Sequence, residues 1–196
     1  LISFLIAASN WGFLDSLGHS FVTHNDRNLD ILVSILIPAR NEQDSIAKCL
    51  KSVGIQDYEK LEILILNDQS IDNTKLLIEQ AIESDPRMRM VQGTTPPSGW
   101  TGKNWACEQL YKEAKGQFFL FIDADTILSR ETVSSAIYES RKADIDLLSI
   151  MPRRLTNCMT ERIIYPLLDW ILFCWMPMKA VHNKRIPYPS PTFGQF

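Results

Sequence analysis

The chain has 196 residues, of which 45% are hydrophobic and 22% are charged, and its formal net charge at pH 7 is −3. A chain of this length buries the core of one domain with room for an extra helical element, and its charge balance provides no broad basic surface for nonspecific nucleic-acid binding. The 4 cysteines are widely scattered, which argues against a zinc site or a disulfide scaffold and is typical of reduced thiols in a cytosolic domain.

The chain opens with a predominantly apolar segment, LISFLIAASNWGFL, at residues 1–14. This segment is shorter than the roughly 20 residues that a membrane-spanning helix requires. We interpret residues 1–28 as part of a transmembrane helix, or as a surface helix that packs its apolar face on the following domain, together with a linker.

Residues 29–152 alternate between short apolar runs and amphipathic segments. Apolar runs at residues 32–37, 61–66 and 118–122 predict strands. Residues 87–91 could form a short strand, and a further strand is predicted near residues 147–150. The helices predicted between them lie near residues 46–53, 72–82, 105–115 and 132–141. Asp72 is positioned to cap the second of these helices and Gly116 to end the third. This alternation predicts an α/β fold with an open, mostly parallel sheet and helices on both faces.

Polar residues follow three of the predicted strands at the point where each strand ends. They are residues 38–42 (PARNE), Asn67 with Asp68, and residues 123–125 (DAD). Parallel strands end at the same edge of a sheet, and the ligands of open α/β sheets bind beyond the carboxyl ends of the strands. We therefore expect these polar groups to converge on one binding site.

Asp123 and Asp125 are the strongest candidates for a metal site. They follow five consecutive apolar residues, and an extended backbone would direct both side chains to the same face. Two neighbouring carboxylates repel each other unless a cation lies beside them. Hard oxygen ligands suit Mg²⁺ or Mn²⁺, which substrate phosphates commonly help to bind. The alternative is a solvated turn.

Three further charged residues have two interpretations each. Asp68 accepts hydrogen bonds, so it could read the N3–H donor of uracil or thymine, or it could form an Asx turn or cap the next helix. Glu42 is either a ligand-binding residue or a favourable charge at a helix N-terminus. Lys103 lies in the breaker-rich loop GTTPPSGWTGK, residues 93–103, where a glycine-flanked cation could close on a diphosphate or could simply be solvated.

The composition changes beyond Pro152. Residues 163–181, IIYPLLDWILFCWMPMKAV, are apolar and aromatic but are interrupted by Pro166, Asp169 and Pro177. We predict an interfacial helix with Trp170 and Trp175 at the headgroup boundary of a membrane. The basic residues available to anionic lipid are Lys179, Lys184 and Arg185. A buried helix or a protein docking surface is the alternative.

Three stretches together carry a resemblance to a known family. The stretches VSILIPARNE, LNDQSIDNT and FFLFIDADT resemble, in their order and separation, the donor-binding half of inverting GT-A glycosyltransferases of family 2 type. The stretch GWTGKNWA is similar to the membrane-linked subgroup that includes carotenoid- and hopanoid-associated glycosyltransferases. The resemblance covers about residues 33–126. It implies a Rossmann-like GT-A domain over residues 29–152, followed by the start of an acceptor and membrane-interface region at residues 153–196.

The resemblance implies roles on the nucleotide side of the site. Pro38 and Ala39 would line the uracil pocket through their backbone. Glu42 and Asp68 would contact the ribose and the base. Lys103 would approach the phosphates.

It also implies roles on the metal and acceptor sides. Asp123 would lie by the ribose or the metal, and Asp125 would coordinate the metal that bridges the diphosphate. In this family a catalytic carboxylate base lies further along the chain, so we expect it beyond Phe196. Glu161 and Asp169 lie in an apolar, proline-broken context, which argues against either as the base.

The activity implied by the resemblance is transfer of a hexose from a UDP-sugar to a lipid or polyisoprenoid acceptor, with inversion and with Mn²⁺ or Mg²⁺. The catalytic domain would lie on the cytoplasmic side of the cell membrane. One alternative is a nucleotidyltransferase, which would normally carry a glycine-rich loop after the first strand, whereas PARNEQDS has no glycine. A second is a subunit that binds a sugar nucleotide without transferring the sugar.

Overall fold

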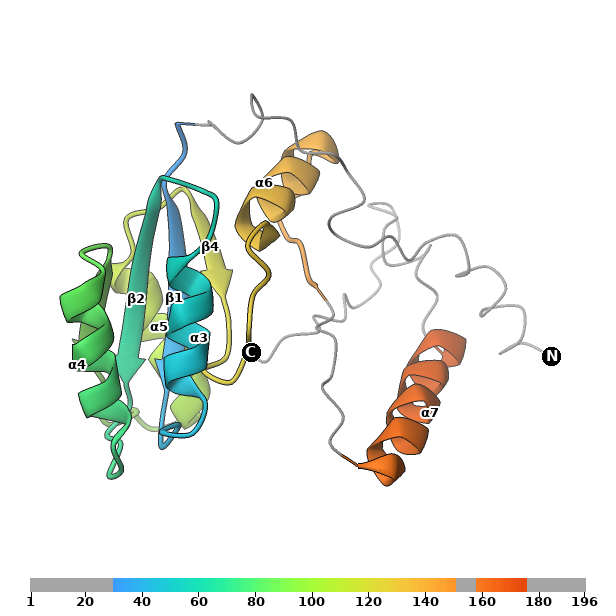
Figure 1. The fold of residues 1–196 in the computed structure, drawn as a ribbon, viewed down its shortest axis with the longest axis horizontal. Coiled ribbons are helices and arrows are strands. Elements are labelled where there is room, and N and C mark those ends of the chain that lie inside the picture. Colours follow the sequence, from blue (N-terminus) through green and yellow to red (C-terminus); the bar gives the residue numbers. More distant parts are fainter. Residues whose placement is uncertain (1–29, 151–157, 176–196) are drawn as a thin grey trace. The chain divides into compact units, whose positions relative to one another are not determined.

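The structure, a computed structural model, describes residues 30–150 and 158–175. They belong to two units, which we describe separately: an α/β domain that extends to Leu148, and a unit that contains helix α7 (Met159–Trp175). Element labels follow Figure 1. The predicted helix and linker at residues 1–28, and the basic residues that follow α7, lie outside the described residues.

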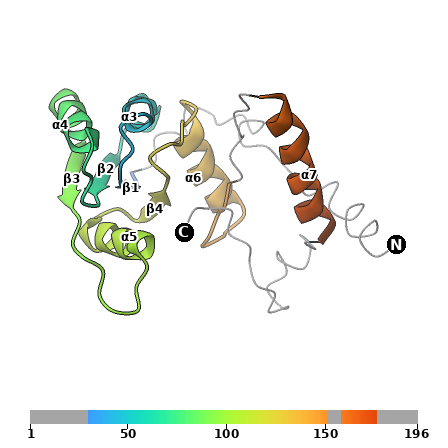
Figure 2. The same cartoon turned by 90° about the horizontal axis from the view of Figure 1, so that it is seen from below.

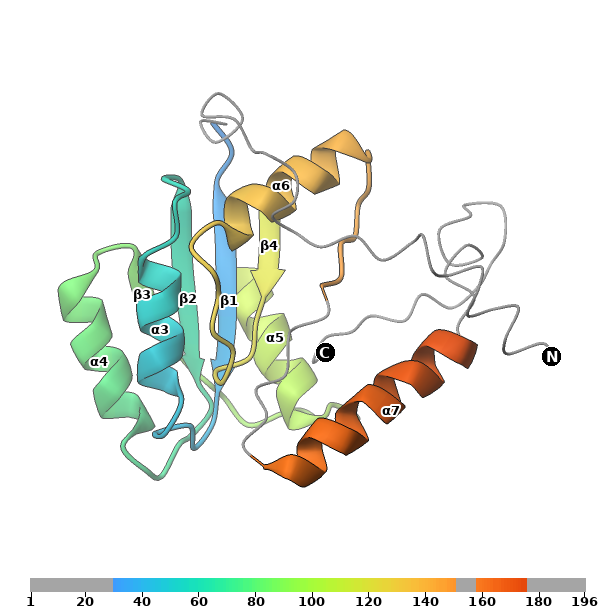
Figure 3. The ribbon, with the colours of Figure 1, turned by 45° about the vertical axis from the view of Figure 1, so that its right-hand side comes forward.

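The α/β domain is built on one sheet of four parallel strands in the order β3-β2-β1-β4 (Figure 1). The strands are β1 (Val33–Ala39), β2 (Leu61–Asn67), β3 (Met88–Gln92) and β4 (Phe118–Phe121). The register pairs Val33 with both Leu61 and Phe118, and it pairs Ala39 with Asn67. The arrows of β1, β2 and β4 accordingly point the same way in Figure 3, so these strands share one carboxyl edge.

Helices cover both faces of this sheet. They are α3 (Ile46–Gly54), α4 (Thr74–Ser84), α5 (Gly102–Glu113) and α6 (Thr132–Lys142). Figure 2 shows α3 and α4 on one side of the sheet and α5 on the other. The predicted open parallel α/β architecture is confirmed.

Two apolar cores lie against the two faces. Every second residue of β1 and β2 points to the same face of the sheet and packs with α3, α4 and α6 in the larger core. This core includes Ile35, Leu50 and Ile137. The smaller core joins Leu36 of β1 to Leu110 of α5. Because β1 and β2 are buried on both faces, their sequences are continuous apolar runs rather than alternating ones.

The prediction of a strand at residues 147–150 is wrong. Helix α6 ends at Lys142, and Asp144 has a left-handed backbone with φ of 49°. The described residues from 145 to 150 form no strand, and the side chain of Leu147 is 59% exposed. A short, mostly apolar stretch such as residues 147–150 becomes a strand only where a neighbouring strand pairs with it, and the stretch itself does not carry that information.

The amino edge of the sheet is fastened by Glu62 of β2. Its carboxylate accepts hydrogen bonds from the hydroxyl of Ser34 and from the backbone N–H groups of Lys115 and Gly116. The N–H of Gly116 also donates to Ser34 Oγ at 2.8 Å. A Cβ at residue 116 would lie 2.7 Å from the backbone nitrogen of Ser34 and 2.9 Å from the carbonyl oxygen of Leu32. Only glycine permits this close approach of two backbones.

We predict that Gly116→Ala destabilises the domain, because the added methyl group must displace backbone rather than a flexible side chain. The expected loss in the free energy of unfolding is about 1–3 kcal/mol, measured by urea denaturation. Gly54→Ala is the matched control, since a Cβ there meets only side-chain atoms at 3.5 and 3.6 Å. Equal stability of the two variants would contradict the proposed close approach.

Candidate functional site

A pocket of about 240 Å³ lies at the carboxyl edge of the sheet. It is lined by the segments that follow β1, β2 and β4 and by the first residues of α5. The lining residues are Pro38, Ala39, Arg40, Glu42, Asp68, Gly102, Lys103, Ala106, Asp123, Ala124 and Asp125. All the residues predicted for the nucleotide and the metal are in this lining, whereas Arg40, Gly102, Ala106 and Ala124 were not predicted. The convergence expected at this edge is therefore observed, while the individual roles stay predictions.

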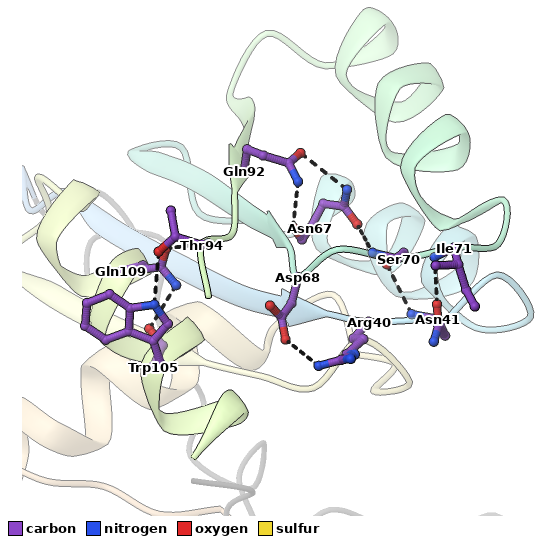
Figure 4. A network of polar contacts seen from close by, with 10 residues as sticks. All are labelled: Arg40, Asn41, Asn67, Asp68, Ser70, Ile71, Gln92, Thr94, Trp105 and Gln109. Carbon is purple, nitrogen blue, oxygen red and sulfur yellow. Dashed lines mark hydrogen bonds and ion pairs between the residues drawn. The ribbon is translucent and has the colours of Figure 1, made fainter. Parts of the chain in front are cut away.

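The loops that follow β1 and β2 are tied to each other (Figure 4). The N–H of Asn41 donates to Ser70 Oγ at 3.1 Å, and the N–H of Ile71 donates to Asn41 Oδ1 at 3.0 Å. Asn41 and Gln69 both have a left-handed backbone with φ of 55°. Such conformations cost energy for residues other than glycine and are typical of functional loops held by their surroundings. The reciprocal contacts supply that support.

The N-termini of α3 and α4 are joined in a similar way. The N–H of Glu42 donates to Thr74 Oγ1 at 2.7 Å, and the N–H of Gln43 donates to Asp72 Oδ2 at 3.2 Å. Asp72 Oδ1 accepts the N–H of Thr74 at 3.0 Å, so Asp72 satisfies a first-turn donor of α4 although Asn73 holds the N-cap position. Hydrogen bonding from the Thr74 side chain holds the pKa of Asp72 below its ordinary value.

Asp68 directs its carboxylate into the pocket. The neighbouring Asn67 takes a turn-supporting role instead, since its Oδ1 accepts the N–H of Ser70, three residues on, at 3.2 Å. The backbone N–H of Asp68 donates to the carbonyl of Ala39 at 2.8 Å, and its Oδ2 lies 3.4 Å from Nη1 of Arg40 (Figure 4). Arg40 was missed in the sequence, although its place inside the PARNE stretch could have identified it.

The loop that precedes α5 is fixed to that helix by Trp105. Its indole Nε1 donates to Thr94 Oγ1 at 3.0 Å, and the N–H of Thr94 donates to Gln109 Oε1 at 2.9 Å (Figure 4). The ring of Trp100 packs edge-on against that of Trp105 with a centroid separation of 5.4 Å. Both ends of the breaker-rich loop are thereby held close to α5.

Lys103 lies in the first turn of α5, not in the loop as predicted. The helix begins at Gly102, with Thr101 in the N-cap position. The ammonium Nζ of Lys103 lies 2.8 Å from Oδ1 of Asp123, and the two side chains are 43% and 19% exposed. In the ligand-free pocket, Lys103 is therefore paired with Asp123 rather than free in solvent, while its role toward a diphosphate stays a prediction.

Asp123 and Asp125 lie on a turn rather than on the extended backbone that was expected. The N–H of Thr126 donates to the carbonyl of Asp123 at 3.0 Å, which closes the turn. Both aspartates nevertheless line the same pocket, because the turn begins where β4 leaves the sheet. The predicted neighbourhood of the two carboxylates is correct, and the predicted backbone geometry is wrong.

The pocket lining is acidic overall. The lining contains four carboxylates and only two basic side chains, those of Arg40 and Lys103. In the part of the chain that the structure describes, no group of three or more His, Cys, Asp or Glu side chains is arranged to hold a metal ion. Magnesium-type sites often use one or two carboxylates with phosphate oxygens and water. The pair Asp123 and Asp125 therefore fits a divalent cation that a diphosphate helps to bind.

The thiol of Cys49 lies beneath this acidic turn. Its Sγ donates to the carbonyl of Asp123 at 3.6 Å, and its side chain has no exposed surface. Burial, together with the negative charges of Asp125, Asp123 and Glu42, raises the pKa of the Cys49 thiol from 9.0 to about 12. The thiol is therefore neutral at physiological pH and acts as a buried hydrogen-bond donor.

We predict that iodoacetamide at pH 8 modifies the exposed Cys158 and leaves Cys49 unmodified in the folded protein, because only the thiolate reacts. Alkylation of Cys49 should become appreciable only as the pH rises toward 12 or after unfolding in urea. Peptide mass spectrometry measures both sites in one sample. Comparable modification of the two cysteines at pH 8 would contradict this assignment.

Comparison with known proteins gives a family and two groups of relatives. Residues 34–179 match the family described as Glycosyl transferase family 2. A 4,4'-diaponeurosporenoate glycosyltransferase of Staphylococcus haemolyticus is 33% identical over 122 residues, which are 61% of this chain and 32% of that protein. A GalNAc(5)-diNAcBac-PP-undecaprenol beta-1,3-glucosyltransferase of Campylobacter jejuni is 27% identical over 131 residues, which are 66% of this chain and 39% of that protein. The matched region thus spans about a third of the length of these relatives.

Two solved structures share the fold. The S. aureus TarS structure superposes with a TM-score of 0.51 at 24% identity, over 66% of this chain and 39% of that chain. The mannosyltransferase PcManGT from Pyrobaculum calidifontis gives a TM-score of 0.58 at 21% identity, over 85% of this chain and 49% of that chain. The chain therefore belongs to glycosyl transferase family 2, with a GT-A fold and with relatives among carotenoid and undecaprenol-linked glycosyltransferases.

Proposed function

We propose that this chain binds the donor in a metal-dependent glycosyltransferase that moves a hexose from a UDP-sugar to a lipid-linked or polyisoprenoid acceptor with inversion. The observation that carries the proposal is the meeting of Asp68, Lys103, Asp123 and Asp125 in one pocket at the carboxyl edge of the sheet. These groups match the base, the diphosphate and the cation of a metal-bound sugar nucleotide.

The nucleoside end of the donor would lie by β1 and β2. The backbone of Pro38 and Ala39 forms one wall, and the carboxylate of Asp68 accepts the N3–H of the base. Glu42, whose Oε2 accepts the hydroxyl of Ser45 at 2.6 Å, lies within reach of the ribose. A uracil base is supported by this acceptor and agrees with the TarS structure, which was solved in complex with UDP.

The diphosphate would lie between the turn after β4 and the start of α5. Asp123 and Asp125 would hold Mn²⁺ or Mg²⁺, which when bound offsets the charge of the departing diphosphate. The N-terminal turn of α5 and the ammonium of Lys103 add positive potential on the opposite side. The PcManGT structure contains GDP-Man and Mn²⁺, which supports a metal-assisted donor site in this fold.

Inversion follows from the direction of attack. With the diphosphate held by Lys103 and the acidic turn, an acceptor hydroxyl attacks the anomeric carbon in line from the opposite side while UDP leaves. A general base must take the proton of that hydroxyl. Glu161 and Asp169 lie on α7, in the other unit, and we assign neither as this base.

The acceptor class is inferred from α7 and from the relatives. Large apolar side chains of this helix are 44–76% exposed, whereas Glu161, Tyr165 and Asp169 are half-buried. None of the described helices has the length and apolar character needed to cross a membrane. We propose that α7 lies in the plane of a membrane surface with its apolar side chains among the lipids, which agrees with the undecaprenol-linked relatives. The catalytic domain would then lie on the cytoplasmic side of the cell membrane.

We predict that the chain binds UDP only with Mn²⁺ or Mg²⁺ present, which isothermal titration calorimetry with metal or with EDTA measures. Asp125→Asn should weaken metal-dependent binding by about ten-fold or more, because a charged ligand is lost, with little change in melting temperature since Asp125 is exposed. Asp146→Asn, at an exposed residue outside the pocket, is the matched control. Equal UDP affinity in EDTA would contradict the proposal, and a large loss of thermal stability in Asp125→Asn would make Asp125 structural.

We also predict that Leu167→Asp lowers binding to vesicles of phosphatidylglycerol and phosphatidylcholine, because it places a charge among the exposed apolar side chains of α7. Vesicle flotation measures the bound fraction. Leu76→Asp is the matched control, since Leu76 is 54% exposed on the α/β domain and Leu167 is 56% exposed on α7. A similar bound fraction for both variants and the wild type would argue against an interfacial α7.

A further inference from the structure

Both basic side chains of the pocket are paired with carboxylates that the donor complex needs. Arg40 is paired with Asp68, and Lys103 is paired with Asp123 at 2.8 Å. The shorter of these pairs joins the cation expected to meet the phosphates to a carboxylate expected to meet the metal. The ligand-free arrangement therefore differs from the one that the donor complex requires.

We propose that Lys103 is an exchangeable counter-ion of Asp123. In the ligand-free pocket its ammonium neutralises the Asp123 carboxylate, and on donor binding it transfers to the diphosphate while the divalent cation takes its place. The inference rests on the proposed function and adds a coupling between metal and nucleotide to it.

The exchange follows from the charges at the acidic turn. An ammonium at 2.8 Å from Asp123 Oδ1 occupies an oxygen that a metal would use, and the two cations repel each other at this range. Asp125 alone gives a divalent cation few protein ligands. Metal binding without nucleotide is therefore opposed by Lys103, whereas a diphosphate offers this ammonium a new partner of opposite charge.

The position of Lys103 allows the transfer without a change of fold. It lies in the first turn of α5, on a flexible four-carbon stem, and its neighbour Gly102 lies beside the other ion pair. A Cβ on Gly102 would lie 3.9 Å from Asp68 Oδ2 and 4.0 Å from Arg40 Nη1. Rotation about the side-chain bonds of Lys103 is therefore enough to move its ammonium group from Asp123 to a diphosphate bound beside the start of α5.

Thermodynamic linkage makes the consequence reciprocal. If nucleotide removes Lys103 from Asp123, the metal binds more tightly with UDP than without it, and UDP gains affinity from the metal by the same factor. A lysine that contacted only phosphate would leave the nucleotide-free affinity for metal unchanged. The exchange role and the phosphate-only role of Lys103 therefore predict different Mn²⁺ affinities in the absence of nucleotide, and this affinity is measured without any catalysis.

The test is a Mn²⁺ titration of the chain with and without UDP, in which electron paramagnetic resonance measures free Mn²⁺. Without UDP, Lys103→Met should bind Mn²⁺ about two- to five-fold more tightly than wild type, as expected for removal of one partly exposed ion pair. The factor by which UDP tightens Mn²⁺ binding should fall by the same factor, because UDP no longer has to remove a lysine from Asp123 before the metal binds there. Lys103→Gln should behave in the same way.

Lys112→Met is the matched control for net charge, because Lys112 lies on the same helix and is paired with Glu108 at 3.0 Å, outside this pocket. It should leave both constants at their wild-type values. Suppose that both Lys103 variants bind Mn²⁺ without UDP as tightly as wild type does, and that UDP tightens Mn²⁺ binding by the wild-type factor. This result would overturn the exchange and leave the proposed donor site intact. UDP binding by wild type that is the same in Mn²⁺ and EDTA would overturn the metal-dependent donor site and the exchange with it.

Discussion

β1 is hydrogen-bonded to β2 on one side and to β4 on the other, in a parallel register that aligns Val33 with both Leu61 and Phe118. Beyond Ser34 and Glu62 at the amino edge, the three strands are apolar until they reach their carboxyl ends, so the polar residues that follow appear together at that edge. This pairing, rather than any local contact, brings residues more than fifty positions apart into one pocket. Its stability depends on the two apolar cores that bury both faces of β1 and β2.

The loops at this edge convert that alignment into a defined pocket. In the loop after β1, the side chain of Asn41 accepts a hydrogen bond from the backbone N–H of Ile71 in the loop after β2. In return, the side chain of Ser70 accepts one from the backbone N–H of Asn41. These reciprocal contacts hold left-handed residues in place and keep Asp68 available to a ligand. On the other side, the indole of Trp105 holds the loop that leads to Lys103. The pocket is thus organised before any ligand binds, which lowers the entropic cost of binding.

The acidic character of the pocket has a chemical consequence. Four carboxylates in a small volume repel each other, and only two basic side chains offset them. Burial raises the pKa of the Cys49 thiol, and the charges of three of these carboxylates, Asp125, Asp123 and Glu42, raise it further. A divalent cation beside Asp123 and Asp125 would relieve this repulsion, which connects the electrostatics of the ligand-free site to the proposed metal-bound donor.

Long-range features of the fold were predictable from the sequence, whereas local geometry was less so. Buried parallel strands leave continuous apolar runs such as residues 61–66, and the polar residues that follow them indicate the binding edge. The turn at Asp123 and the start of α5 at Gly102 depend on local backbone conformations that the pattern of apolar and polar side chains does not predict. Arg40 was missed because one arginine in a polar loop is common, and its pairing with Asp68, which follows another strand, shows only in the fold.

The central claim is that metal and nucleotide meet at the shared carboxyl edge of the sheet. Paramagnetic broadening of backbone amide signals by Mn²⁺ in the presence of UDP, with Mg²⁺ as the diamagnetic reference, tests it most directly. The account predicts strong broadening at Asp68, Gly102 and Ala124, with sharp signals at Leu61 and Gly116 on the opposite edge. Broadening centred at the amino edge or on α7, or none at Ala124 at saturating UDP and Mn²⁺, would contradict it.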